Sequence, residues 1–474
     1  MTRSIKLAFA LLIFSSSFGQ DKWDIRRCVN HALKNNISVR QTDLQSRFSE
    51  LTYKQNKAGQ LPSLNFGSST GYRLGRSENP TTGVLEDNNF LNLGMQVQSS
   101  VNLFNWFSQK NTIEASRLSW EADKEQTKKI QNDIALNVAV AYLQILLSGE
   151  QANLSEVQVE QTKAQLENTR KRVDAGILPE LNAAELEAQL ARDSSSLVTA
   201  KAAVQQFLLQ MKALLNLDAG APFDIVTPPV GLIPVEALAD LQPEAVYATA
   251  ISTLPQQKVN TLRIQSAQKS MAAAKAGMYP TFSAFGNLST SYVNIKSYSR
   301  QFGPLVPTGA VVDVNGINQP VLAPDVILIE GKPIPLGSQL RNNFGQSFGI
   351  GVNIPIFNGK AARTAWDRSK LTVKQLELQK EQGDLQLKQD IYKAYTDATA
   401  ALQKFNADKK SVQTAEKAYD FASKRYELSL LSTYDLINSQ NNLQRARIQA
   451  LYSQYDYVFK MKLLEFYKGQ GIKL

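Results

Sequence analysis

Apolar and polar side chains alternate with a period of two residues along four stretches of the chain. The clearest stretch, about 90–104, has the apolar set Leu91, Leu93, Met95, Val97, Val101 and Leu103. The same phase returns in about 344–357, with Phe348, Ile350, Val352, Ile354 and Ile356. This alternation predicts half-buried β-strands. The stretches of about 63–74 and 281–292 precede these two, so the sequence predicts four strands arranged as two hairpins.

The predicted strands are longer than those of most globular proteins. Each exceeds about ten residues, which is roughly twice the usual length and enough for a tilted strand to cross a bilayer. Small residues fall on the less apolar face, as expected for a water-facing interior: Gly67, Ser69, Gly71, Gly349 and Gly351. Aromatic residues gather at the strand ends, as in interfacial girdles: Tyr72, Phe90, Phe104, Trp106 and Phe107. A soluble β-sandwich is the alternative.

Long helices argue against the sandwich. Neither Gly nor Pro occurs between Asn105 and Ser148, or between Asp384 and Lys468. A helix of about 65 residues is close to 100 Å long, which no compact domain requires. Each run is expected to turn back once, at about 174–180 and at about 428–434. Heptad-like apolar spacings, such as Ile134, Val138, Ala141 and Ile145, predict coiled-coil packing of the resulting helical hairpins.

The chain contains two copies of one unit. Phe104-Asn105 aligns with Phe357-Asn358 at an offset of 357 − 104 = 253, and identities persist without a gap over about 90 residues. Upstream, Pro62 aligns with Pro280 at an offset of 280 − 62 = 218. The difference, 253 − 218 = 35, indicates an insertion in the second copy, expected as an extended loop over about 299–343. The expected division is a first repeat over 20–218, a linker over 219–240 and a second repeat over 241–474.

The N-terminus has the layout of a secretory signal peptide over 1–19. Arg3 and Lys6 precede the apolar run 7–14, and the small residues Ser17 and Gly19 precede an expected cut near Gln20. A retained membrane anchor is the alternative, but the run is too short to span about 30 Å of hydrocarbon. No later stretch approaches about 18 consecutive apolar residues, so we expect the mature chain to have no transmembrane helix.

Four strands crossing lipid imply an oligomer. Unpaired strand edges would expose backbone N–H and C=O groups to hydrocarbon, at a cost of several kcal/mol each. Because about eight strands are the practical minimum for a closed barrel, several chains must share one. Their helical hairpins would then line up as a second tube.

These features together resemble the TolC family of outer-membrane efflux and secretion ducts. The shared features are the duplication and the boundary pattern Ala-Gly-Xaa-Xaa-Pro at 58–62 and 276–280. A further one is a hairpin signature, Arg-aromatic-Xaa-Xaa-Gly-Xaa-Xaa-Ser-Xaa-Xaa-Asp-Leu, present here as 425–436 and in weaker form as 172–182. The resemblance spans essentially the whole mature chain.

The resemblance implies a mixed fold, with long coiled-coil helices plus transmembrane β-structure. It implies a homotrimer with a shared twelve-stranded barrel in outer-membrane lipid, continued by a periplasmic α-helical barrel. Pro62 and Pro280 would mark the helix-to-strand boundaries. The hairpin tips would form the periplasmic aperture and dock a periplasmic adaptor (membrane fusion) protein, with an inner-membrane RND or ABC transporter supplying energy. The implied tip residues are Gly176, Ile177, Leu178, Asn182, Tyr426, Ser429, Leu431, Ser432 and Asp435.

Three tip positions depart from the family pattern. Leu431 stands where an arginine can sit, Asn182 where an aspartate can sit, and Ser429 replaces a glycine. We therefore expect closure by packing and hydrogen bonds rather than by charge pairs.

Little in the sequence points to catalysis. His31 is the only histidine and Cys28 the only cysteine, so His-based metal sites and Ser/His/Asp or Cys/His arrangements are excluded. The net charge of +10 is spread along helices among acidic residues, so no nucleic-acid partner is expected. The sequence predicts a passive duct without cofactor or metal. The alternative is an exported coiled-coil structural or adhesive surface protein without a pore. A metal-specific exporter is not favoured, because His- and Met-rich tracts are lacking.

Overall fold

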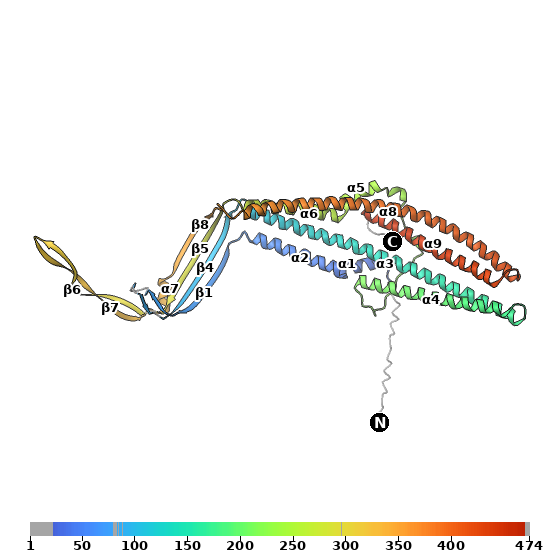
Figure 1. Cartoon of the computed structure of the whole chain (residues 1–474), viewed down its shortest axis with the longest axis horizontal. Helices are drawn as coiled ribbons and strands as arrows, with labels where there is room; N and C mark the ends of the chain where they lie inside the picture. Colours follow the sequence, from blue (N-terminus) through green and yellow to red (C-terminus); the bar gives the residue numbers. More distant parts are fainter. Residues whose placement is uncertain (1–21, 79–82, 84, 88, 295, 470–474) are drawn as a thin grey trace, which may run out of the picture. The chain divides into compact units, whose positions relative to one another are not determined.

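The computed structural model describes residues 22–469 except 79–82, 84, 88 and 295 (Figure 1). The expected signal peptide lies outside the described residues. The chain divides into two compact units, which do not follow the two repeats. A helical unit comprises residues up to 52, 116–267 and from 371 onward, and a strand-rich unit comprises 53–115 and 268–370. Each repeat therefore contributes to both units.

Eight helices carry most of the chain. They are α1 (Ile25–Asn35), α2 (Ile37–Ala58), α3 (Ser108–Asp174), α4 (Glu180–Leu215), α5 (Pro243–Thr253), α6 (Pro255–Ala276), α8 (Ala361–Glu427) and α9 (Thr433–Tyr467). Both α3 and α8 have 67 residues, and each continues through one glycine beyond the predicted runs without Gly and Pro, Gly149 in α3 and Gly383 in α8. Capping sets the ends of other helices. The Asp24 side chain accepts from the Arg27 N–H at the start of α1, and Asn216 ends α4 in the left-handed conformation.

Each repeat has a core within the helical unit, and the core of the first repeat also includes Tyr455 and Val458 of α9. In the first, Cys28 and Ala32 of α1 pack with Val138 and Tyr142 of α3 and with Met211 of α4, all almost fully buried. In the second, the matching set is Leu241, Val246, Ala250, Ile391, Ala394, Ala398, Met461 and Leu464. Ala32 and Ala250, paired by the 218 offset, are both completely buried. The duplication in sequence is thus a duplication of packing.

Within α3 lies one stretch long and apolar enough, by length and composition alone, to cross a membrane. Core helices of soluble domains can have the same length and apolar composition. Val138, Tyr142 and Leu146 from the same helix are buried in the first core, so we assign this stretch to packing between helices.

The strand-rich unit contains one four-stranded antiparallel sheet in the order β1-β4-β5-β8 (Figure 1). Its strands are β1 (Ser63–Arg73), β4 (Phe90–Phe104), β5 (Thr281–Val293) and β8 (Gly345–Asn353). The register places Phe66 opposite Val97 and Val97 opposite Leu288, so one apolar face continues across the strands. β8 ends at Asn353 rather than near 357, because Pro355 has no N–H to continue the ladder.

The expected extended loop over about 299–343 is not irregular. It contains β6 (Lys296–Val314) and β7 (Ile317–Pro333), paired antiparallel, followed by the short helix α7 (Leu336–Asn342). Prolines and glycines in this segment suggested a loop, but cross-strand pairing accommodates them at three register shifts. A second small hairpin, β2 (Arg76–Glu78) with β3 (Leu85–Asp87), was also not predicted. The described chain therefore has eight strands, four of them in the predicted sheet and four in two separate hairpins.

Candidate functional site

The helical unit has two hairpin tips with the same backbone structure. The first tip, residues 175–179, joins α3 to α4, and the second tip, residues 428–432, joins α8 to α9. At the first, the N–H groups of Gly176 and Ile177 donate to the carbonyls of Val173 and Arg172. At the second, Ser429 and Leu430 repeat the pattern on Tyr426 and Arg425. Both are Schellman motifs, which require a left-handed residue.

Side chains connect the end of α3 to the end of α8. The hydroxyls of Thr169 and Tyr426 lie 2.9 Å apart, and both side chains are buried. Arg172 donates to the Ser429 hydroxyl and, at 3.4 Å, to the Tyr426 carbonyl oxygen, while its guanidinium lies 5.8 Å from the Tyr426 ring centroid. We call this set, Thr169, Arg172, Tyr426 and Ser429, the tip latch. It joins the two hairpins without a salt bridge.

Of the latch residues, the sequence prediction included Tyr426 and Ser429 but not Thr169 or Arg172. The 253 offset aligns Arg172 with the signature residue Arg425, but this alignment did not identify Arg172 as a tip residue. Further along α3, Gln165 donates to the Tyr419 hydroxyl at 2.6 Å. Burial raises the pKa of Tyr419, so this phenol stays protonated near neutral pH.

The second tip holds its acidic residue in a helix cap. Ser432 precedes α9 and accepts from the Asp435 N–H, while its hydroxyl donates to the Asp435 carboxylate at 2.7 Å. This reciprocal arrangement satisfies two polar groups at the helix start. Nearby, Leu431 packs against a cluster of Ala422, Tyr426 and Leu436. The position where relatives can carry an arginine is thus used for packing.

The remaining predicted tip residues lie at the first tip. Ile177 is 62% exposed, and Leu430 at the second tip is 63% exposed. Asn182 lies in the first turn of α4, where its N–H donates to the Pro179 carbonyl. Exposed aliphatic residues at the ends of helical hairpins are typical of contact surfaces.

A buried polar network lies farther along the same helices. Thr162 of α3 and Gln189 of α4 both donate to the carboxylate of Asp193 at 2.7 Å, and Gln440 of α9 donates to Thr162 at 3.0 Å. Asp193 is 8% exposed. Because the carboxylate accepts from neutral donors of two helices, the network fixes the mutual register of α3, α4 and α9.

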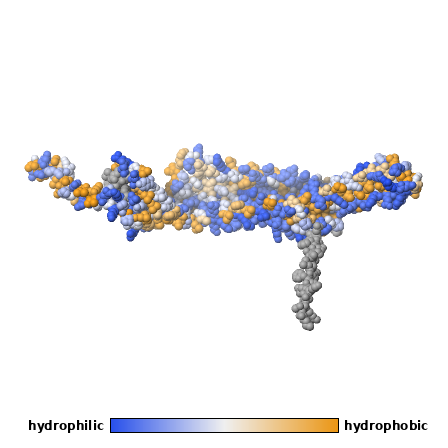
Figure 2. Space-filling model, turned by 90° about the horizontal axis from the view of Figure 1, so that it is seen from below, coloured by the Kyte–Doolittle hydropathy of each residue, from blue (hydrophilic) through white to orange (hydrophobic). Residues whose placement is uncertain are grey.

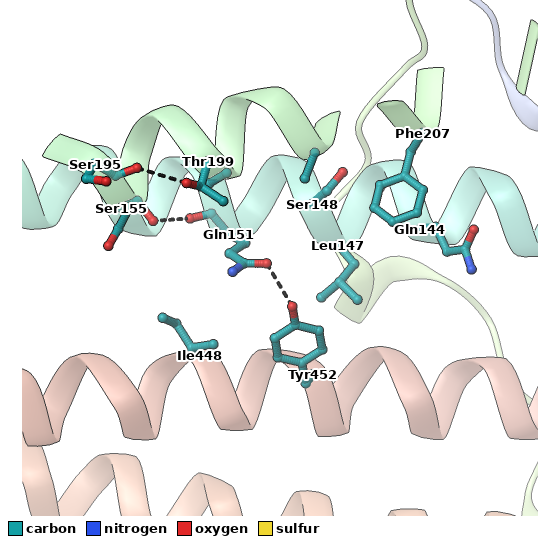
Figure 3. A pocket seen from close by; sticks show the side chains of 13 residues that line it. Gln144, Leu147, Ser148, Gln151, Ser155, Ser195, Thr199, Phe207, Ile448 and Tyr452 are labelled. Carbon is teal, nitrogen blue, oxygen red and sulfur yellow. Dashed lines mark hydrogen bonds between the residues drawn. The ribbon is translucent and has the colours of Figure 1, made fainter. Parts of the chain in front are cut away.

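Beside this network, α3, α4 and α9 border a groove of about 550 Å³ (Figure 3). Its polar lining consists mainly of hydroxyls and amides, among them Ser148, Gln151, Ser155, Ser195 and Thr199. Tyr452 crosses toward α3 and donates to Gln151 at 2.9 Å. The groove brings together no acid, base and nucleophile, so its lining is suited to contact rather than catalysis.

Neither the single histidine nor the single cysteine forms a reactive site. His31 packs edge-on against the Trp23 ring at 5.1 Å between centroids. Burial raises the pKa of the Cys28 thiol to about 12, with a smaller contribution from Asp24, so the thiolate is not formed near neutral pH. Among the residues that the structure describes, no group of His, Cys, Asp and Glu is placed to hold a metal ion.

The strand-rich unit offers a different kind of surface. Large apolar residues on one face of the sheet are strongly exposed: Leu64 is 74% exposed, Phe66 69%, Phe348 75% and Ile350 71%. The two outermost strands, β1 and β8, each pair on one side only. Pro62 and Pro280 lie between the ends of α2 and α6 and the starts of β1 and β5. An exposed apolar face is unfavourable in water and favourable in lipid. The unpaired edges of the sheet can hydrogen-bond to further strands.

Known proteins match both the sequence and this architecture. BepC, an outer membrane efflux protein of Brucella suis biovar 1 (strain 1330), is 22% identical over 428 residues, covering 90% of this chain and 81% of BepC. The CmeC outer membrane channel of Campylobacter jejuni superimposes with a TM-score of 0.73 at 15% identity, covering 95% of this chain and 86% of CmeC. VceC, an outer membrane protein of Vibrio cholerae, gives 0.69 at 14% identity, covering 94% and 96%.

The model of a protein family described as outer membrane efflux protein matches residues 28–217 and 246–464, one segment for each repeat. These segments include both helical hairpins and all four strands of the sheet. The chain therefore belongs to the outer membrane efflux protein family, and it is an efflux duct of the outer membrane.

Proposed function

We propose that the chain acts as a homotrimer, in which three four-stranded sheets close one twelve-stranded barrel. The observation that carries this proposal is the sheet itself: four strands with an exposed apolar face and unpaired edges at β1 and β8. One chain has too few strands to close, and in lipid its edges require partners. Pairing β8 of one protomer with β1 of the next satisfies both edges at once.

Cysteine crosslinking between the edges tests this arrangement. Ser68→Cys on β1 would be combined in turn with Gln346→Cys, Phe348→Cys or Ile350→Cys on β8, because the register between protomers is to be found. At least one pair is expected to give an oxidised trimer on denaturing gels, from material in the outer-membrane fraction. The matched control joins Ser68→Cys with Met95→Cys on the interior strand β4. A monomer in the aqueous fraction would contradict the proposal.

The tip residues are proposed to form the periplasmic aperture. The hydrogen bonds of the tip latch support a closed resting state held without charge pairs, since Leu431 and Asp435 are used for packing and capping. Exposed Ile177 and Leu430, with the groove of Figure 3, support docking of a periplasmic adaptor protein. Energy for transport would come from an inner-membrane transporter of the RND or ABC class, as the family resemblance implies.

The β6–β7 hairpin is proposed to lie at the extracellular mouth. Together with α7, it connects β5 to β8 at the strand ends farthest along the chain from α6 and α8. Figure 2 shows apolar residues in orange along it, and Phe302, Leu305 and Ile317 are each more than half exposed. Replacing residues 298–331 with a short Gly-Ser turn should raise single-channel conductance in planar bilayers, if the hairpin restricts the mouth. Unchanged conductance would remove that role.

A further inference from the structure

A cavity of about 300 Å³ lies at the first strand–helix boundary, within the strand-rich unit. Lys57 comes from the last turn of α2, Lys110 from the first turn of α3 and Lys269 from α6. Tyr53 and Asn111 add polar side chains to the lining, and Glu114 contributes the one carboxylate. Three ammonium groups and one carboxylate give 3 − 1 = 2 net positive charges.

The three lysines are not neutralised by the protein. Within the described part of the chain, none of the three forms an ion pair with a carboxylate, although many other lysines of the helices do. Converging like charges repel one another, and a bound anion relieves that repulsion. Ammonium groups are common ligands of phosphate, where they act as point charges.

Aromatic residues place this cavity beside lipid. The Phe104 ring lies 6.4 Å from Phe282, which shares the exposed apolar face of the sheet, and 5.6 Å from Phe107. Lys110 in turn lies 6.0 Å from the Phe107 ring centroid. These neighbouring side chains form a continuous series from the lipid-facing strands to Lys110. Aromatic rings at this level are typical of the interface between hydrocarbon and headgroups.

The backbone between β4 and α3 is strained in order to present these rings. Trp106 has φ 52° and Phe107 φ 62°, in the left-handed region that bulky residues rarely adopt. Trp106 stacks on Tyr279 at 5.0 Å, and Phe107 remains 60% exposed. The second repeat has Gly359 at the position of Trp106, so the strain at Trp106 points to a use for its side chain.

The second repeat lacks both features at the matching boundary. At the 253 offset, Gly359 and Lys360 replace Trp106 and Phe107 with the same positive φ. Trp366 takes the place of Ile113, and Asp367 that of Glu114. Arg363 and Lys370 both pair with Asp367, at 3.2 and 2.9 Å. The basic groups of the second boundary are thus satisfied within the chain.

We propose that the lysine cavity binds the phosphate of an anionic phospholipid headgroup in the periplasmic leaflet of the outer membrane. The inference rests on the proposed placement of the sheet in lipid. The phosphate lies among Lys57, Lys110 and Lys269, and the acyl chains run along Phe107 and Phe104 toward the sheet. The first boundary of each protomer carries one such site.

Native mass spectrometry of the purified mature protein in detergent tests the site, with phosphatidylglycerol and phosphatidylcholine as probes. The wild type should retain phosphatidylglycerol about tenfold better than phosphatidylcholine. Lys57→Gln/Lys110→Gln/Lys269→Gln should lower that preference to near one. The matched control, Lys275→Gln/Arg363→Gln/Lys370→Gln, also removes three positive charges and should keep the preference. The single variant Lys110→Gln should reduce it in part, in case the triple variant misfolds.

Three results would overturn the proposal: equal retention of the two lipids, equal retention by wild type and triple variant, or equal losses in the triple and control variants. A further arm adds millimolar inorganic phosphate. Complete displacement of phosphatidylglycerol by phosphate would assign the cavity to a soluble anion instead. Trimer formation and outer-membrane fractionation are measured in parallel. Their loss would count against the proposed function, whereas normal trimers without lipid selectivity would count against this site alone.

Discussion

The two repeats share a backbone at places where they do not share residues. At the tips, Gly176 and Ser429 occupy the same left-handed position, with φ 75° and 61°. At the strand–helix boundaries, Trp106-Phe107 and Gly359-Lys360 do the same. At the tips and at the Trp106/Gly359 position, one repeat has a glycine, which adopts this conformation without penalty, and the other has a residue that does not. At the Phe107/Lys360 position, neither repeat has a glycine.

The difference shows where a side chain has a use beyond folding. A non-glycine residue in the left-handed region costs about 1–3 kcal/mol, so its presence calls for a contact that only that side chain makes. Ser429 accepts from Arg172 of the other hairpin, and Trp106 stacks on Tyr279. At each position, the repeat with the glycine shows the backbone conformation that the fold requires, and the other repeat shows which side chain has been added. Departures between the copies therefore coincide with the proposed gate and the proposed lipid boundary.

The largest expected effect comes from a buried ion pair in the second repeat. Lys462 and Glu465 of α9 are 3% and 6% exposed at their side chains and lie 2.8 Å apart, whereas the first repeat has Leu209 and Lys212 at these positions. Lys462→Met should lower the free energy of unfolding by about 3–5 kcal/mol, because an unpaired carboxylate remains buried. Thermal or denaturant unfolding measures this.

Two further variants check that reading of the ion pair. Adding Glu465→Gln to Lys462→Met should restore most of the loss, since the amide still accepts from the Glu236 N–H. Leu209→Ala, at the half-exposed counterpart, should change stability by no more than about 0.5 kcal/mol. A double variant as unstable as the single would show that packing, rather than the unpaired charge, is responsible.

Next in size is the tip latch. Arg172 reaches the other hairpin, whereas its counterpart Arg425 donates to Leu430 of its own tip at 3.4 Å. Arg172→Ala should destabilise the closed tips by about 1–2 kcal/mol, which raises the open-to-closed ratio about 5- to 30-fold. Planar-bilayer recording measures the open fraction. Arg425→Ala should change it little, and equal effects of the two variants would remove the distinction between the hairpins.

Smaller effects are expected at the glycines, where the space for a methyl group is open. Gly176→Ala and Gly359→Ala should each destabilise the protein by about 1 kcal/mol, from backbone conformation alone. Gly149, inside α3 and also without neighbours for an added Cβ, is the matched control. Its replacement by Ala should stabilise the helix by about 0.5–1 kcal/mol. If Gly149→Ala lowered the stability, backbone conformation would not explain why the glycine substitutions are expected to act in opposite directions.

The smallest effect concerns pH. Burial alone would raise the pKa of Glu125, but hydrogen bonds from Lys258 and Lys128 outweigh it and lower the pKa below the usual 4.5. The resulting stabilisation is present above that value and is lost as pH falls through the folded-state pKa. The change should stay below about 1 kcal/mol, because the lysines are exposed to solvent. Glu125→Gln should abolish this part of the pH dependence, while Leu378→Gln at the matching position should leave it intact.

Several features of the protein could be predicted from residue patterns. The period of two located the four strands of the sheet, and the long runs without Gly and Pro indicated helices of unusual length. The irregular composition of 299–343 did not reveal the β6–β7 hairpin, because prolines and glycines hide strand periodicity when register shifts absorb them. The tip latch was not predicted either, because Thr169 and Tyr426 are 257 positions apart in sequence.

The sequence by itself determined the duplicated unit, the unusual length of its helices and the four strands of the sheet, and it is the basis of the proposed oligomer. All of these follow from local periodicity and from the cost of unpaired peptide groups in lipid. Only the tertiary structure decided which side chains of the two repeats meet, that Ser432 caps α9 and donates to Asp435, and that three lysines from three helices line one cavity. These contacts depend on how segments that are distant in sequence pack together, and the periodicity within one segment does not identify the residues that it contacts.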